Sequence, residues 1–195
     1  MLRVYYNETV ANYTQDKLLR LLENANLDPT LKNAFISRVR KGGLSREENA
    51  TSHICVYFAA YDPNLNQVFI GRHIKSGLWL FNGGHLDKDE SLEDTLYREM
   101  DEEWNIVKKI ENTTPSLFTL TKIEHPEKQI CEWHYDIWYF IPFDKNTFNP
   151  SRDYLLQEFF EWGWKTIDEA QSLARDKATL TGIDFISNQV SPHQT

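Results

Sequence analysis

Hydrophobic positions follow a helical period in the first fifty residues of the chain. Their spacing predicts two amphipathic helices. Thr14 is a good N-cap for the first helix. Asp28, followed by Pro29, is a good N-cap for the second, which should end at Gly42 and Gly43. The apolar positions of the two helices are Leu18, Leu19, Leu21, Leu22, Leu31, Phe35, Ile36 and Val39.

After a linker loop at 44–52, the pattern changes to short apolar runs that predict β-strands. Thr166 and Thr181 are candidate N-caps for two closing helices. Strands with helices before, between and after them predict an α/β sandwich around a mixed sheet. We expect residues 1–50 to form a helical extension and residues 51–195 the main domain. The strand-like runs are 52–61, 67–72, 78–82, 116–124, 130–142 and 158–165.

The composition is that of a globular protein, and a chain of 195 residues can bury a sizeable core. A net charge of −8 disfavours binding to nucleic-acid backbones. The chain shows neither a signal-peptide pattern nor a run long enough to span a membrane, so we expect a cytoplasmic protein. Cys55 and Cys131, both in strand-like runs, are interpreted as reduced core thiols.

One segment carries nearly all of the excess negative charge. Between Gly84 and Ile106 there are nine acidic and two basic residues, which gives a charge of −7. Its second half predicts a helix, because Ser91 is a good N-cap, Asp94 can reciprocate three residues later, and 92–104 contains no helix breaker.

Three carboxylates of this predicted helix fall on one side of it. Glu99, Glu102 and Glu103 have the spacing i, i+3 and i+4 and border the apolar stripe that faces the sheet. Like charges at this spacing repel one another, and a divalent cation held among them would relieve the repulsion. The alternative is a solvated acidic face without a ligand.

The spacing of this segment resembles the signature box of the Nudix hydrolases. Five residues separate Gly84 from Glu90, and seven more lead to Arg98-Glu99-Met100, then Glu102-Glu103 and Asn105-Ile106. The preceding 78–85 and the later Glu158, Glu161 and Trp164 are also similar to that family. Some of its subgroups carry an N-terminal helical extension and a His-x-Asp, which His134 and Asp136 resemble.

Two positions depart from the family pattern. Asn105 stands in place of the last glycine of the box, and Asn82 in place of the proline that commonly precedes Gly-Gly. Asn tolerates a left-handed backbone better than most residues, so we expect Asn105 to adopt this conformation at the end of the helix. Neither departure removes a carboxylate.

The resemblance implies a Nudix-type α/β/α sandwich and a divalent-metal-dependent hydrolase that cleaves a diphosphate bond in a nucleoside-diphosphate-type substrate. It implies that Glu99, Glu102 and Glu103 hold Mg²⁺ or Mn²⁺ together with the Gly84 carbonyl. It also implies that Arg98 and Glu90 belong to the catalytic residues. Arg98 should pair with Glu90 or a neighbouring glutamate, and Glu99 is a candidate base. A further acidic ligand from outside the box is expected to be Glu158, Glu161 or Asp136.

The substrate itself is not predicted. Candidate contacts are basic or polar residues near the box, and aromatic rings that could stack on a base or simply belong to the core. The candidates are Arg72, His73, Lys75, Trp79, Phe81, His85, Trp133, His134, Asp136, Trp138 and Glu158.

Two other functions stay open at this point. One is a Nudix-fold module that binds a nucleotide without cleaving it, although such modules typically lose box glutamates. The other is an isoprenyl diphosphate isomerase, which would need a catalytic cysteine that neither Cys55 nor Cys131 resembles in context. The expected partner is a small nucleotide or diphosphate rather than a membrane or a nucleic acid, and a homodimer stays open.

Overall fold

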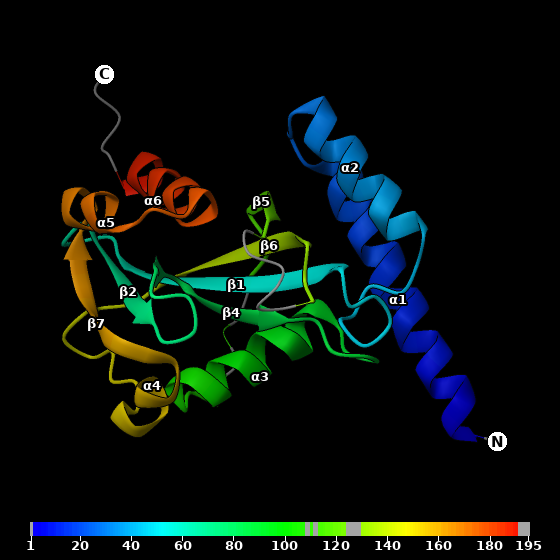
Figure 1. Cartoon of the computed structure of the whole chain (residues 1–195), viewed down its shortest axis with the longest axis horizontal. Helices are drawn as coiled ribbons and strands as arrows, with labels where there is room; N and C mark the ends of the chain where they lie inside the picture. Colours follow the sequence, from blue (N-terminus) through cyan, green and yellow to red (C-terminus); the bar gives the residue numbers. More distant parts are fainter. Residues whose placement is uncertain (1, 108–109, 111–112, 124–129, 191–195) are drawn as a thin grey trace. The chain divides into compact units, whose positions relative to one another are not determined.

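The structure is a computed structural model that describes residues 2–107, 110, 113–123 and 130–190. Helices precede, interrupt and follow the strands along the chain (Figure 1). The elements are α1 Leu2–Asn24, α2 Pro29–Arg40, β1 Ser52–Asp62, β2 Gln67–His73, β3 Trp79–Leu80, β4 Asn82–His85, α3 Leu92–Trp104, β5 Leu117–Lys122, β6 Trp133–Pro142, α4 Arg152–Glu158, β7 Phe159–Thr166, α5 Ile167–Leu173 and α6 Lys177–Val190.

The strands within the described residues form a seven-stranded sheet. Its order is β3-β2-β1-β6-β5, with β4 paired to β1 and β7 paired to β2. The predicted α/β fold, a mixed sheet with helices, is therefore confirmed. None of the described helices combines the length and the apolar character of a membrane span.

The chain divides into two compact units. Unit 1 comprises 1–56, 84–96 and 118–136, and unit 2 comprises 57–83, 97–117 and 137–195. The predicted division into 1–50 and 51–195 follows a different criterion, the change of periodicity, and stays a prediction.

In unit 1 the N-terminal helices pack against each other and onto strand residues. Gln15 Nε2 on α1 donates a hydrogen bond to the Val39 carbonyl on α2 at 2.9 Å. Phe35 of α2 is fully buried, and its ring makes edge-on contacts with Phe118 and Tyr135. Helix α2 of the extension therefore packs on strand residues of unit 1.

In unit 2 the alternation of side chains along β2 separates two apolar layers. Val68 and Ile70 are buried in a cluster with Trp138 and with residues of α5 and α6, such as Ile167 and Ile183. The intervening Phe69 instead belongs to an aromatic cluster. Its ring contacts Trp104 of α3, Phe148 and Trp164.

Two predicted helix starts were wrong. The first helix begins at Leu2, and Thr14 lies inside it. The last helix begins at Lys177, and the Thr181 hydroxyl donates to the Lys177 carbonyl one turn earlier instead of capping. Asp176 provides the cap, since its carboxylate accepts from the N–H of Thr179 at 2.7 Å.

Other boundaries differ in smaller ways. The single strand predicted at 78–82 is split into β3 and β4, and helix α4 was not predicted. The strand predicted at 116–124 is found as β5, and Glu124 lies outside the described residues. The second helix is capped by Asp28, whose carboxylate accepts from Thr30 and Leu31 N–H groups, as predicted.

Candidate active site

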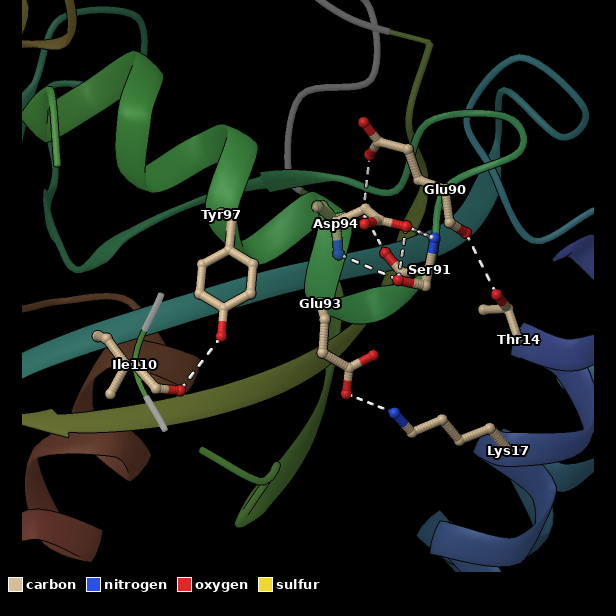
Figure 2. Close-up of polar contacts among 9 residues, drawn as sticks. Thr14, Lys17, Glu90, Ser91, Glu93, Asp94, Tyr97 and Ile110 are labelled. Carbon is tan, nitrogen blue, oxygen red and sulfur yellow. Dashed lines mark hydrogen bonds and ion pairs between the residues drawn. The ribbon is translucent and has the colours of Figure 1, made fainter. Parts of the chain in front are cut away.

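In unit 1, the first turn of helix α3 is held by its own cap. The Ser91 hydroxyl accepts from the Asp94 N–H at 3.1 Å, and the Asp94 carboxylate accepts from the Ser91 N–H at 3.1 Å (Figure 2). The predicted reciprocal cap is therefore present. Helix α1 contributes as well: Thr14 donates to the Glu90 carbonyl at 3.3 Å, and Lys17 pairs with Glu93.

Glu90, a candidate box residue, lies just before this cap. One of its carboxylate oxygens accepts a hydrogen bond from the Thr95 hydroxyl at 2.8 Å. The extension therefore contacts the backbone of Glu90 while helix α3 holds its side chain. The catalytic role assigned to Glu90 stays a prediction.

In unit 2, the end of helix α3 takes the backbone conformation predicted for it. Asn105 has a φ of 55°, in the left-handed region where the box glycine of the family stands. Its N–H donates to the Asp101 carbonyl at 2.8 Å, and the next N–H, of Ile106, donates to the Met100 carbonyl at 3.3 Å. The Tyr97 hydroxyl also donates to the Ile110 carbonyl at 3.2 Å (Figure 2).

The three box glutamates of unit 2 differ in exposure. Glu99 and Glu103 are buried, with exposed fractions of 8% and 7%, whereas the side chain of Glu102 is 58% exposed. Arg98 Nη1 lies 2.7 Å from Glu99 Oε1 and 3.2 Å from Glu102 Oε2. The expectation that Arg98 pairs with a neighbouring glutamate is thus confirmed, and this pairing uses one oxygen of each carboxylate.

Glu103 lies in the most enclosed environment of the three. Asn82 Nδ2 donates to its Oε2, and the Gly83 N–H donates to its Oε1 at 3.3 Å. Burial raises the pKa of Glu103 well above its usual value, and the negative charges of Glu99 and Glu158 raise it further, against the effect of the Asn82 hydrogen bond. A positive charge beside Glu103 would therefore favour its ionised form.

The donors around Glu103 fit a hard divalent cation. The available ligand atoms of Glu99, Glu102 and Glu103 are all carboxylate oxygens, which Mg²⁺ and Mn²⁺ prefer. Asn82 Oδ1 is buried and has no hydrogen-bond partner among the described atoms, which adds an unsatisfied oxygen beside Glu103. The ligation by these residues and by the Gly84 carbonyl stays a prediction.

Among the candidates outside the box, Glu158 of unit 2 has the best electrostatic support. It lies close enough to Glu103 to raise that residue's pKa. The neighbouring His73, whose Nε2 is 3.6 Å from Glu158 Oε2, lowers the pKa of Glu158 itself, and the charge of Lys75 lowers it further. Glu158 is thus an ionised carboxylate whose negative charge acts on Glu103.

The remaining candidates of unit 2 are divided between surface and core. Arg72 is exposed on β2, opposite Trp79 on β3 and Glu161 on β7. Trp79 is buried in the apolar cluster, and Lys165 Nζ lies 5.1 Å from the centre of its ring. Trp138 is also fully buried and stacks on Tyr57. These contacts account for the two Trp residues as core aromatics, and a role in binding substrate stays a prediction.

In unit 1, Asp136 is held by threonines of the neighbouring strand. Its Oδ2 accepts from the hydroxyls of Thr119 and Thr121 at 2.9 and 2.5 Å. His85 and His134 lie beside each other and beside His53, with ring centres 4.7–5.1 Å apart. His53 was not among the candidates predicted from the sequence. The feature that could have identified it is its position two residues before Cys55, on the same face of β1.

Comparison with known proteins places the fold. A model of the NUDIX domain matches residues 51–186. No curated protein matches the sequence. Among solved structures, the chain resembles the E. coli dihydroneopterin triphosphate pyrophosphohydrolase at 14% identity and a TM-score of 0.55, over 69% of this chain and 95% of that chain.

Two further solved structures show the same fold. The MutT NUDIX hydrolase from Burkholderia pseudomallei is 18% identical, with a TM-score of 0.54 over 69% of this chain and 97% of that chain. The NUDIX domain of Shewanella oneidensis NrtR, complexed with ADP ribose, is 15% identical, with a TM-score of 0.52 over 72% and 88%. The family model covers more than half of the chain, and the chain therefore belongs to the Nudix family, which supports the prediction of a Nudix-type diphosphatase.

Proposed function

We propose that the chain is a divalent-metal-dependent hydrolase that cleaves a diphosphate bond in a nucleoside-diphosphate-type substrate. The observation that carries this proposal is the set of box carboxylates on one helix. Two of them, Glu99 and Glu103, are buried, and the third, Glu102, is paired with Arg98. A folded protein keeps buried like charges together at a cost in free energy, and a bound cation offsets that cost.

In this proposal Glu99, Glu102 and Glu103, with the Gly84 carbonyl, hold Mg²⁺ or Mn²⁺. A bound cation of this kind masks the charge of the diphosphate and polarises the phosphoryl oxygens. Arg98 fixes the side-chain positions of Glu99 and Glu102 through its two ion pairs.

Proton transfer is assigned to Glu99, which would accept a proton from the attacking water. Asn82 and Gly83 fix the orientation of the Glu103 carboxylate by donating one hydrogen bond to each of its oxygens. Glu158 is proposed as the acidic group from outside the box, because its negative charge already acts on Glu103.

The substrate class rests on the family and on its solved members. One similar structure is a dihydroneopterin triphosphate pyrophosphohydrolase, and another was solved with ADP ribose. Dihydroneopterin triphosphate and ADP ribose each contain a nucleoside-like group joined to adjacent phosphates. We therefore propose a nucleotide or nucleotide-like diphosphate as the small-molecule substrate, with the exposed Arg72 as a phosphate contact.

The second candidate function is a Nudix-fold module that binds a nucleotide without hydrolysis. The similarity to an ADP ribose-bound NUDIX domain favours it. The three box glutamates argue against it, because a module that only binds a nucleotide needs neither three carboxylates for a cation nor a general base such as Glu99. The isomerase alternative has no support from its cysteines, since Cys55 and Cys131 are both buried thiols with exposed fractions of 2% and 1%.

A substrate panel tests the proposal. Nucleoside triphosphates, ADP-ribose, nucleotide sugars and dinucleoside polyphosphates would each be incubated with the chain and Mg²⁺ or Mn²⁺. The products would then be separated by chromatography. We expect metal-dependent cleavage of at least one substrate, and its loss on chelation. Saturable binding of a nucleotide in calorimetry with no product formed would favour the binding module instead.

A further inference from the structure

A second group of metal-ligating side chains lies in unit 1, away from the box glutamates in sequence. His53, Cys55, His85 and His134 each offer one ligand atom, and these atoms all lie within 4.8 Å of one another. A fifth residue joins them, since Cys131 Sγ is 3.7 Å from His53 Nε2 and 3.9 Å from His85 Nε2. We call these five residues the His/Cys cluster.

The pairing of the strands explains why these residues meet. His53 and Cys55 are two residues apart on β1 and therefore share one face of it. Strands β4 and β6 both pair with β1, and they carry His85 and His134. The central strand thus contributes two ligands and each neighbour contributes one, while Cys131 comes from the segment before β6.

The hydrogen bonds of the cluster leave ring nitrogens available as electron-pair donors. His53 Nδ1 donates to the Asn49 carbonyl at 2.9 Å, which leaves Nε2 as the unprotonated nitrogen of the neutral ring. Metal-binding histidines in proteins are commonly oriented by such a bond from their other nitrogen. His134 Nε2 is buried and has no hydrogen-bond partner among the described atoms.

Hydrogen bonds within the cluster do not satisfy all of these nitrogens. The Cys131 sulfur can serve both His53 and His85, but neither contact reaches His134 Nε2, which has no hydrogen-bond partner among the described atoms. Burial lowers the pKa of His53, and burial together with the nearby His85 and His53 lowers the pKa of His134 to about 3.

The donor set selects the class of ion. Imidazole nitrogens with thiolate sulfur suit Zn²⁺ and similar transition-metal ions, whereas Mg²⁺ prefers oxygen. In a tetrahedral zinc site, with Zn–N bonds of about 2.0–2.1 Å and Zn–S bonds of about 2.3 Å, the ligand atoms are roughly 3.3–3.8 Å apart. Side-chain shifts on the order of 1 Å would bring the cluster to this spacing, and the partly exposed His85 gives an ion a path inward.

We propose that His53, His85 and His134, with the thiolate of Cys55 or Cys131, form a second metal site for Zn²⁺ or a chemically similar transition-metal ion. The ligating cysteine loses its proton to solvent as its sulfur binds the ion. The site joins β1, β4 and β6, so its effect is on the stability of unit 1. It does not depend on the proposed hydrolysis.

Cobalt titration of the full chain tests this proposal. Co²⁺ would be added in the presence of excess Mg²⁺, which occupies the carboxylates, and absorption would be recorded in the visible and near-ultraviolet. We expect the visible bands of tetrahedral Co²⁺, a near-ultraviolet thiolate-to-cobalt band, and loss of both when Zn²⁺ is added. His73, which lies outside the cluster, provides the matched control variant His73→Gln.

The variants separate the ligands. His134→Gln should weaken Zn²⁺ binding by more than the ~10- to 100-fold caused by loss of an outer hydrogen-bond partner. His73→Gln should bind like the wild type. Should His134→Gln fail to fold, His85→Gln at the partly exposed position takes its place. Cys55→Ser and Cys131→Ser, made singly and together, identify the thiolate.

Two results would overturn the proposal. One is a wild-type chain that shows no tetrahedral Co²⁺ spectrum and no rise in melting temperature with Zn²⁺. The other is a thiolate band that persists in His134→Gln and His85→Gln at the wild-type affinity. A band that survives either single serine variant but disappears in the double variant supports the site and shows that either sulfur can serve.

Discussion

Replacing Glu103 with Gln separates the cost of the buried carboxylate from the cation that is proposed to offset it. The carboxylate is 7% exposed and accepts hydrogen bonds from Asn82 and the Gly83 N–H. Gln has one acceptor oxygen, which can keep the Gly83 bond. Its NH₂ group can donate to Asn82 Oδ1 once the Asn82 amide turns over, because that oxygen is buried without a partner.

The expected change in stability without metal follows from these contacts. Residues four apart on a helix have Cβ atoms about 6 Å apart. Two charges at this separation repel by at most roughly 3 kcal/mol at an effective dielectric constant of about 20. Glu103→Gln removes this repulsion from Glu99 and keeps both hydrogen bonds. The free energy of unfolding without metal should therefore equal that of the wild type or exceed it by up to ~3 kcal/mol.

With metal, the order should reverse. Mg²⁺ at about 100 times its dissociation constant stabilises the folded wild type by ~2.7 kcal/mol. For a chain of this length, that corresponds to a rise in melting temperature of about 5–10 °C. Glu103→Gln should gain little of it. Asp101→Asn, on the same helix and outside the proposed ligand set, should respond to Mg²⁺ like the wild type.

Thermal unfolding followed by circular dichroism, in matched ionic strength with and without Mg²⁺, measures both differences. Two results would contradict the proposed cation site: a loss of several kcal/mol by Glu103→Gln without metal, or a full Mg²⁺-dependent rise in its melting temperature. The first result would mean that the carboxylate is a structural hydrogen-bond acceptor. The second would mean that Mg²⁺ binds without it.

Three further predictions concern the fold. Gly71→Ala would place a Cβ in a steric clash with the ring of the buried Phe159, so unfolding by urea should show a loss of about 1–3 kcal/mol or more, and a wild-type midpoint would contradict the packing. Phe35→Ala should lower the free energy of unfolding by about 3–5 kcal/mol, because the Phe35 ring is fully buried against Phe118 and Tyr135. Tyr13→Ala, at a 62% exposed position, should change it little, and equal effects of the two variants would refute the packing of the extension. Burial tends to raise the pKa of Asp62, but hydrogen bonds from the N–H groups of Lys145, Leu65 and Asn64 lower it overall. The Asp62 carboxylate therefore binds a proton more tightly in the unfolded chain than in the folded one. The stability that it contributes is lost as pH falls below about 4 through the folded pKa. Asp62→Asn should therefore lower stability at neutral pH and reduce the further loss in acid, and an unchanged acid limb of the urea midpoint against pH would contradict this.

Two features of the box with a local sequence signal were predicted correctly. The cap of helix α3 depends on Ser91 and Asp94, three residues apart, and the left-handed Asn105 depends on the last position of one helix. Such features are decided by neighbouring residues, so a single sequence contains the information. Most of the strands were found for a similar reason, because they lie in apolar runs, although the run at 78–82 is split between β3 and β4.

Features that depend on distant residues were missed. Asp136 was a candidate ligand in the sequence, but the hydroxyls of Thr119 and Thr121 reach it only because β5 lies beside β6. The His/Cys cluster likewise needs three strands to be brought together. The start of α6 was misplaced because Asp176 and Thr181 are both plausible caps, and the choice depends on where the preceding turn places the chain.

The hydrolysis rate of the box variants tests the central claim most directly. A substrate identified in the panel would be assayed with the wild type, Asp101→Asn, Glu99→Gln and Glu103→Gln at saturating Mg²⁺, with folding of each variant checked by circular dichroism. If the carboxylates hold the cation and Glu99 accepts the proton, Asp101→Asn should hydrolyse the substrate at close to the wild-type rate. Both Gln variants should then lose at least about 100-fold in rate, as expected for loss of general-base catalysis or of a metal ligand. Folded Glu99→Gln and Glu103→Gln variants that hydrolyse the substrate at near the wild-type rate would contradict the assignment of the active site to this helix.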